Sequence, residues 1–249
     1  MQHPPFKNPP IIEAVVALKF LGGTDWSEEQ RAAIREGLRV VYDGPERQEV
    51  QFRVQTKIEG DDATTTTTAA PRRVLLSTAD GTGLVGVGDG VLSIHVLRPY
   101  PGWKTFEGRV RFAADVVTAV TGARVLQEVA LRYIDRIALP TSALLPLERY
   151  FTVIPRRPDG MPGSLAAFQC ITEAHDAESN AVAVLTTTAV PPNPGESFAM
   201  LYDLNLFRVF PKERPLEVEQ YSGVLNALHR RQYEIFMDSI TDDTKELFQ

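Results

Sequence analysis

The chain has 249 residues, of which 43% are hydrophobic and 23% are charged. This balance is typical of a globular protein that is large enough to bury a core. The net charge of −6 argues against non-specific binding to nucleic acid, because neutralising phosphates requires a basic surface. The single cysteine, Cys170, excludes an intramolecular disulfide and a thiolate-cluster metal site.

The sequence contains no stretch of about 18 consecutive apolar residues, so it predicts no membrane-spanning helix. The beginning of the chain has neither the basic flank nor the apolar core of a secretory signal peptide. We therefore expect a protein of the reducing cytoplasm, and we expect neither a membrane nor a nucleic acid as its partner.

The first predicted element is a strand in FKNPPIIEAVVALKF, residues 6–20. Apolar residues recur at every second position from Ile12 to Phe20, which places one row of side chains on a buried face. Pro9 and Pro10 stand directly before this run, where a proline removes no ladder hydrogen bond. The sequence therefore predicts a strand that begins after the two prolines.

A helix and a second strand are predicted next. Ser27 and Gln30 form a capping-box pattern, and the apolar spacing after them predicts a helix of about 14 residues. Residues 48–59 alternate again and predict a strand. The threonine-rich segment that follows, GDDATTTTTAAP, has no apolar face, and we expect a mobile loop there.

Residues 72–100 predict three short strands joined by two glycine-rich hairpin turns. From Thr105 to Thr121 the apolar residues recur every three or four positions, which predicts a helix capped by Gly122 in the left-handed conformation. Alternation then returns and predicts a long strand that ends at Pro140. The predicted order up to this proline is strand, helix, four strands, helix, strand.

Residues 141–163 are rich in proline and show little periodicity, so they are the predicted connection between two parts of the chain. Three alternating segments and the apolar stripe of a helix of about 20 residues follow. Together these features predict an α+β fold of largely antiparallel sheets, with helices covering one face of each. We expect two sheet-plus-helix units, at residues 1–140 and 164–249, packed as one globular body.

Several motifs that suggest chemistry have simpler structural explanations. Residues 81–86 match GxGxxG by letter, but a strand is predicted after them, whereas a dinucleotide loop requires a helix. His95 shares its strand parity with Ser93, against apolar neighbours, so we expect it on the open face of the sheet. Cys170 lies inside a predicted strand, which suits a structural thiol better than a nucleophile. We therefore assign no catalytic residue, no metal ligand and no cofactor.

Two stretches are stronger candidates for a binding site, and the first is YPGW. Here Tyr100 and Trp103 join a strand to a helix and offer the large amphipathic contact area that is enriched in binding sites. The alternative is that Trp103 simply packs the N-terminus of the helix against the sheet.

The second candidate is LRYIDRI. By alternation Tyr133 and Asp135 belong to the apolar row of this strand, whereas Arg132 and Arg136 point to the other face. A carboxylate in a core-facing row has to be paired, hydrogen-bonded or bound to a ligand. A structural salt bridge, or a bulge that re-aims the side chain, is the alternative to a binding role for Asp135.

Taken together, FKNPPIIEAVVALKF, YPGW and LRYIDRI resemble a sporadically distributed prokaryotic family of uncharacterised proteins of about 250 residues. Members of that family open with an N-P-P-I-x-E strand, carry Y-x-x-W before the central helix and follow it with R-Y-I-[ND]-R-I. The resemblance covers nearly the whole chain, because the closing ITDDTKELF is also similar. The position of Asp135 is usually asparagine in the family, which favours a structural role over catalysis. The resemblance implies no activity, cofactor or partner.

We expect a non-enzymatic binding or accessory protein that acts through protein–protein contacts, because exposed strand edges favour association. Its partner would be a second copy or another protein, such as the product of a neighbouring gene. The alternative is an enzyme or sensor with a small-molecule pocket between sheet and helices. The candidate binding residues are Tyr100, Trp103, Arg132, Tyr133, Asp135 and Arg136.

Overall fold

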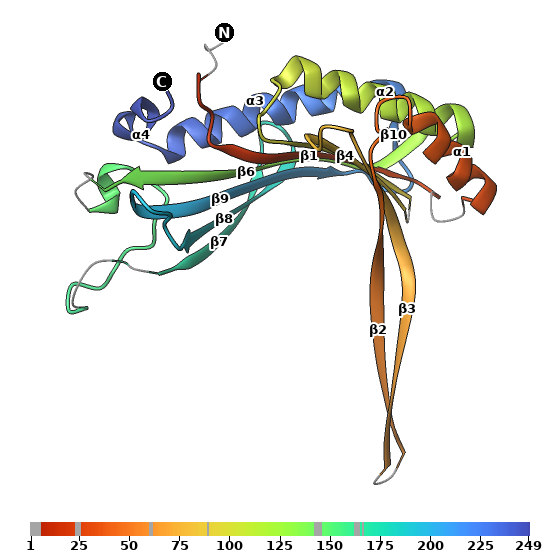
Figure 1. The fold of residues 1–249 in the computed structure, drawn as a ribbon, viewed down its shortest axis with the longest axis horizontal. Helices are drawn as coiled ribbons and strands as arrows, with labels where there is room; N and C mark the ends of the chain where they lie inside the picture. Colours follow the sequence, from red (N-terminus) through yellow and green to blue (C-terminus); the bar gives the residue numbers. More distant parts are fainter. Residues whose placement is uncertain are drawn as a thin grey trace.

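A computed structural model describes residues 6–22, 26–59, 62–88, 90–141, 146–161, 165 and 167–249, with only the backbone described over residues 50–72. The described chain forms a single large antiparallel sheet with helices on one face (Figure 1). The α+β class and the antiparallel pairing are therefore as expected from the sequence. The side-chain alternation expected within residues 50–59 falls outside the described side chains.

The described part of the sheet is 10-stranded, in the order β2-β3-β4-β5-β1-β6-β9-β8-β7, and the short β10 pairs with β6. The strands are β1 (Ile11–Phe20), β2 (Glu46–Glu59), β3 (Asp62–Ser77), β4 (Gly83–Gly88), β5 (Val91–Leu97), β6 (Val125–Pro140), β7 (Gln169–Asp176), β8 (Ala181–Val190), β9 (Glu196–Val209) and β10 (Leu216–Glu217).

Two separate sheet-plus-helix units are not confirmed, because both halves of the chain contribute to one sheet. The long strand β6 pairs with β1 along one edge and with β9 along the other. Both neighbours are antiparallel to it, so β6 joins the first half to the second without a gap. A physical reason is that two separate sheets would each leave this edge with unpaired backbone groups.

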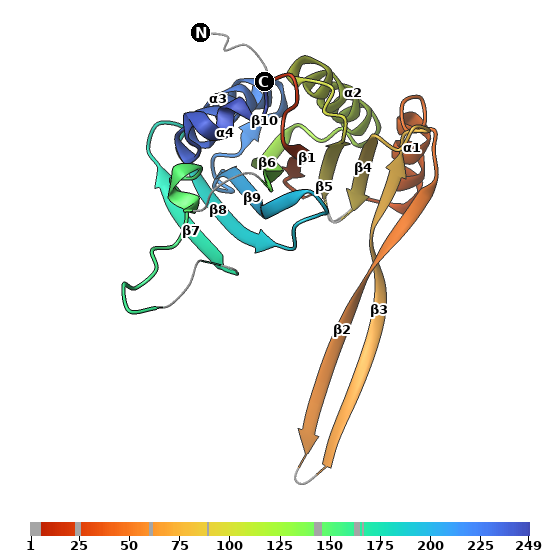
Figure 2. The ribbon, with the colours of Figure 1, turned by 60° about the vertical axis from the view of Figure 1, so that its left-hand side comes forward.

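The described residues form four α-helices: α1 (Glu28–Leu38), α2 (Trp103–Thr121), α3 (Tyr221–Ser239) and α4 (Asp242–Glu246). They lie on the same side of the sheet (Figure 2), where α2 contacts β5 and α3 contacts β6 and β9. The capping box of Ser27 and Gln30 is confirmed, and so is the left-handed cap at Gly122. The helix-facing rows of the strands and the inner faces of the helices form one apolar core.

The first strand begins where its prolines predict. The carbonyl oxygen of Pro10 accepts hydrogen bonds from the backbone N–H of Arg136 and from Nη2 of Arg98, both at 2.9 Å. From Ala14 to Phe20 every second residue is buried against the helices. The predicted alternation of this strand is therefore confirmed.

The prediction of a mobile loop in the threonine-rich segment is wrong for residues 62–71, which lie in β3. They pair with β2 in a hairpin that extends away from the body (Figure 1). Threonine is β-branched and favours extended backbone. A two-stranded ribbon that stands clear of the core needs no apolar face, so the missing apolar row did not exclude a strand. Gly60 and Asp61 lie outside the described residues.

The glycines of the GxGxxG match serve the hairpins between β3, β4 and β5. Gly81 has a φ of +70° in the turn before β4. Gly86 lies within β4, where an added Cβ would stand 2.5 Å from Oγ of Ser93 and 2.9 Å from Leu75. A side chain at position 86 would therefore collide with both neighbours. The interpretation of these glycines as hairpin residues is confirmed, because a strand follows them.

Candidate functional site

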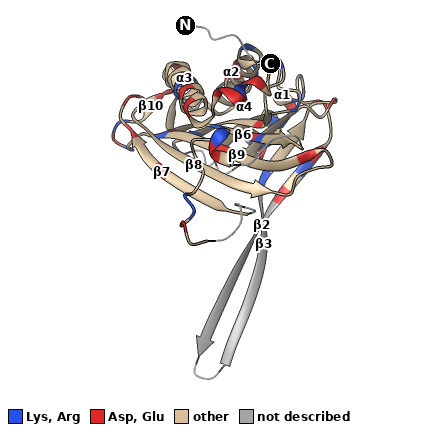
Figure 3. Cartoon of the chain, turned by 90° about the vertical axis from the view of Figure 1, so that its left-hand side faces the viewer, with Lys and Arg blue, Asp and Glu red and all other residues tan. Residues whose placement is uncertain are grey.

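The six candidate residues divide between the two faces of the sheet. Alternation along β6 places Tyr133 and Asp135 towards the helices, where both are buried. Arg132 and Arg136 lie on the other face, which we call the open face because the described helices all lie opposite to it (Figure 3). Tyr100 and Trp103 belong to the helix side. The six residues therefore do not form one site.

Tyr100 joins the first candidate stretch to the second. It lies between β5 and α2, and its hydroxyl is 2.8 Å from the hydroxyl of Tyr133. The two rings meet edge to face with 5.9 Å between their centroids. Burial raises the pKa of Tyr100 to about 12, so both hydroxyls stay protonated at neutral pH.

Trp103 connects α2 to α3. Its ring stacks on the imidazole of His229, with 3.8 Å between centroids and 10° between the planes. Its Nε1 donates a hydrogen bond of 3.3 Å to Oδ1 of Asn226, whose Nδ2 donates to Glu107 at 3.3 Å. Trp103 thus packs against α3. This differs from both arrangements suggested by the sequence, which were a binding site and packing of the helix N-terminus against the sheet.

Asp135 is only 3% exposed, and its side chain makes no hydrogen bond or ion pair among the residues that the structure describes. Burial raises the pKa of its carboxyl to about 8, while the positive charge of Arg98 opposes that shift. Arg98 itself donates to the carbonyl oxygens of Pro10 and Ile11, each at 2.9 Å. At neutral pH the Asp135 carboxyl is therefore mainly protonated.

Neither structural explanation offered for Asp135 applies in the described chain. It has no salt bridge there, and the irregular register lies in the partner strand β1, between Ile11 and Glu13. The side chain of Asp135 keeps the orientation that alternation gives it, opposite Tyr202 of β9.

Three polar side chains of α3 face the same region. Ser239 is 3.0 Å from the hydroxyl of Tyr202, and His229 stacks over Tyr133 with 6.3 Å between centroids. Gln232 lies between them on the same helix face, because residues three and seven apart share a face. We call this set of buried and half-buried residues the polar layer; its members are Tyr100, Tyr133, Asp135, Tyr202, His229, Gln232 and Ser239.

Some atoms of the polar layer lack partners. Gln232 is 4% exposed, and neither its Oε1 nor its Nε2 has a hydrogen-bond partner within the described chain. Nδ1 of His229 is likewise buried and unpartnered there. Burial lowers the pKa of His229 to about 4, so the ring is neutral at physiological pH. Unpaired buried polar atoms are costly to the stability of the fold.

The sequence analysis missed the α3 members of the polar layer. His229 and Gln232 fall on the buried face of α3 between apolar positions, where two polar residues interrupt the stripe. That interruption of the apolar stripe is the sequence signal that could have identified His229 and Gln232. The apolar stripe expected for this helix consists of its apolar residues alone, so it does not include the two polar positions.

The open face carries charges that are paired. Arg132 Nε donates to Oδ1 of Asp203 at 2.7 Å, and Arg136 Nη1 donates to Oε1 of Glu196 at 2.8 Å. The hydrogen bond from Arg136 lowers the pKa of Glu196 to about 2. Figure 3 shows acidic and basic positions interspersed on the strands in that view.

His95 lies on the open face, as its parity with Ser93 predicts. Its Nδ1 is 2.7 Å from Oε1 of Glu13, and its Nε2 is 3.0 Å from Oγ of Ser93. Arg73 donates to the same Ser93 oxygen at 3.4 Å and to Glu49 at 2.6 Å. The hydrogen bond from His95 is the main cause that lowers the pKa of Glu13. These five residues form a connected row from β2 to β1.

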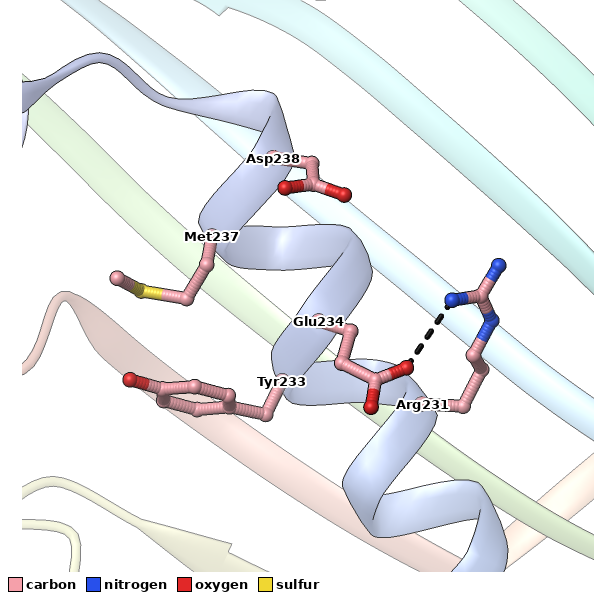
Figure 4. Close-up of a pocket in the computed structure, with 5 residues that line it drawn as sticks. All are labelled: Arg231, Tyr233, Glu234, Met237 and Asp238. Carbon is pink, nitrogen blue, oxygen red and sulfur yellow. Dashed lines mark hydrogen bonds and ion pairs between the residues drawn. The ribbon is translucent and has the colours of Figure 1, made fainter. Parts of the chain in front are cut away.

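Two open hollows lie on the described surface, and neither is bounded by sheet and helix together. One, of about 320 Å³, is lined by residues of α3 alone (Figure 4): Arg231, Tyr233, Glu234, Met237 and Asp238. The other, of about 500 Å³, is lined by residues of α2 alone. Within Figure 4, Arg231 and Glu234 form an ion pair of 3.0 Å. Neither hollow reaches the polar layer.

The described residues contain no group of three or more His, Cys, Asp or Glu side chains placed to hold a metal ion. None of the helices in the described ranges is long and apolar enough to cross a membrane.

Comparison of the sequence with protein-family models gives no match, and comparison with curated proteins gives none either. The resemblance to the prokaryotic family therefore remains an expectation that rests on the three motifs of the sequence.

Proposed function

We propose that this chain is a non-enzymatic cytoplasmic protein that binds another protein through the open face of its sheet. The observation that carries the proposal is a set of half-buried apolar side chains on that face, to which β6, β8 and β9 all contribute, with Asp203 and Asn205 of β9 between them. We call it the open-face patch; its residues are Ile134, Val182, Val184, Leu201 and Phe207.

The surroundings of the open-face patch resemble a binding interface. Arg132 and Val184 lie on either side of Asn205 of β9, and Arg136 is directly opposite Leu201. Protein interfaces combine an apolar centre that includes aromatic residues with arginine and a polar rim. Two of the arginines predicted from the sequence thus border the patch. Because their charges are already paired with Asp203 and Glu196, a partner need not supply carboxylates to them.

Each half of the chain brings a set of neighbouring strands and a long covering helix to this sheet. We propose these halves, residues 1–140 and 164–249 joined by 141–163, as two structural units of one body. The open-face patch then lies where the strands of the second unit meet β6 of the first.

A site-specific photo-crosslinker at Val184 tests the proposal. In the cells that make this protein, we expect one defined protein adduct, which is lost when Phe207→Glu places a charge in the open-face patch. A crosslinker at Val40, which is 80% exposed and outside the patch, serves as the matched control. Identical adducts from both positions, or an adduct that survives Phe207→Glu, would contradict binding through this face.

A second function, a small-molecule sensor or enzyme, is favoured by the unpartnered atoms of His229 and Gln232 beside the protonated Asp135. A ligand that paired with these groups would stabilise the fold by RT ln(1 + [L]/Kd). We expect it to appear in a thermal-shift screen of metabolites and nucleotides, and the shift to vanish in Gln232→Met. A shift that persists in that variant would place the ligand elsewhere.

A further inference from the structure

β7 is the last strand of the sheet in the described part of the chain, and its outer edge faces away from β8. Most of its side chains are exposed, and Ile171 is 65% exposed. An edge strand with an exposed β-branched residue is a template for pairing with another strand unless charge, proline or a covering segment blocks it. The strand contains neither proline nor lysine, and its acidic residues are Glu173 and Asp176.

The backbone of β7 shows which groups point outward. The carbonyl oxygen of Phe168, just before β7, accepts a hydrogen bond of 2.9 Å from the N–H of Ala189 in β8. This pair continues the register of β7 with β8, in which Gln169 is opposite Thr188. In an antiparallel pair, the residues that bond to a given neighbour alternate along the strand. Cys170, Thr172 and Ala174 therefore bond to β8, and Ile171, Glu173 and His175 direct their N–H and C=O groups to the free edge.

We propose that β7 pairs with β7 of a second copy, antiparallel and centred on Ala174. A two-fold axis perpendicular to the sheet keeps each face of the sheet on the same side in both copies. Residues opposite each other must then belong to the same face, so the axis has to pass between the two copies of one residue. The Ala174 register places Glu173 of each copy opposite His175 of the other. The pair occurs twice by symmetry, and the imidazole can donate to the carboxylate in both.

The neighbouring registers lack this complementarity. Centring on Glu173 sets two like charges opposite each other, and centring on Thr172 sets Glu173 against Ile171. Opposite charges across a strand pair stabilise it, and like charges destabilise it. The Ala174 register also joins the outward backbone groups of Glu173 and His175 in about four hydrogen bonds. At the centre, two small alanine side chains allow the close approach of a non-hydrogen-bonded pair.

The dimer would extend the sheet of one copy into the other and leave both open-face patches available. It does not rest on the proposed function. A strictly monomeric protein would refute the dimer and leave binding through the open face standing.

Sedimentation of the full chain over a range of concentrations tests the pairing. We expect wild type to dimerise and Glu173→Lys to raise the dimer Kd about tenfold or more, because two favourable pairs become unfavourable. Glu36→Lys, the same charge change at an exposed position of α1, should dimerise like wild type. The exchange Glu173→His with His175→Glu should restore the dimer. Failure of wild type to dimerise, or equal dimerisation of Glu173→Lys, would overturn the proposal.

Disulfide trapping tests the register. In a Cys170→Ser background, Ala174→Cys should crosslink two copies, because the Cα atoms of a non-hydrogen-bonded pair are about 4.5 Å apart. Ile171→Cys should remain uncrosslinked under the same oxidation. A crosslink at position 171 without one at position 174 would overturn the Ala174 register.

Discussion

Polar side chains on the two faces of β6 differ in whether they have hydrogen-bond or ion-pair partners. On the helix side, Asp135 is buried without a hydrogen bond or ion pair in the described chain. On the open side, Arg132 and Arg136, three residues before and one residue after Asp135, are each paired with a carboxylate of β9. The sequence alternation is the same for both sides. Burial by α3, together with the available partners, decides whether a polar group is satisfied or left alone.

The largest expected effect is on the helix side, from Asp135→Asn. Burial raises the pKa of this carboxyl to about 8, above its unfolded value of about 3.9. The folded state therefore holds the proton that the unfolded state releases, and stability falls as pH rises through this window. Between about pH 5 and pH 8 the wild type should lose roughly 4 kcal/mol from this group.

Asparagine removes that pH dependence, so Asp135→Asn should be more stable than wild type at about pH 8. Urea unfolding at the two pH values measures this. Glu196→Gln on the open side is the control, since the lowered pKa of Glu196 contributes stability that is lost only as pH falls towards about 2. Equal pH slopes for wild type and Asp135→Asn would refute the buried, protonated carboxyl.

A smaller effect is expected from Trp103→Ala, which removes the stack on His229 and the bond to Asn226. Deleting a half-buried tryptophan should lower the free energy of unfolding by about 2 to 3 kcal/mol. Trp103→Phe keeps an aromatic face and should lose less than half of that amount. If alanine and phenylalanine variants unfold at the same denaturant concentration as wild type, Trp103 does not hold α2 to α3.

Gln232→Met should raise the free energy of unfolding by about 1 to 2 kcal/mol, because an apolar side chain of similar shape removes an unpaired buried amide. Thermal and urea unfolding both measure the change. The exposed Gln220, which lies just before α3, offers the matched control, and Gln220→Met should be neutral. Destabilisation by Gln232→Met would mean that the amide is satisfied in solution.

The smallest effect is expected on the open side. Arg132→Ala breaks the ion pair with Asp203, which is partly exposed. Such pairs contribute about 1 kcal/mol or less, and salt screens them. Urea unfolding of Arg132→Ala should therefore differ little from wild type, and the difference should shrink at high ionic strength. A loss above about 3 kcal/mol would show that the open-face pair behaves like a buried one.

Most elements of the fold follow from local patterns in the sequence. The prolines before β1, the Ser27 capping box and the alternation of β6 predicted their elements, because each depends on neighbouring residues only. Even the division of Asp135 from Arg136 across β6 followed from parity. The strand character of the threonine run did not, because the run lacks the apolar alternation from which a strand is predicted.

The site was harder to predict because its parts are far apart in the sequence. The stack of Trp103 on His229 and the approach of Tyr100 to Tyr133 depend on how α2 and α3 cross the sheet. The pairing of β6 with β9, which makes one sheet of the two halves, is equally non-local. Neither propensity nor periodicity contains that information.

The most direct test of the contrast between the two sides is the yield of the crosslinked adduct from a probe at Val184 in two variant backgrounds. If the open side is the binding side, Phe207→Glu abolishes the adduct and Gln232→Met leaves its yield unchanged. Loss of the adduct in Gln232→Met, with its retention in Phe207→Glu, would place function in the polar layer instead.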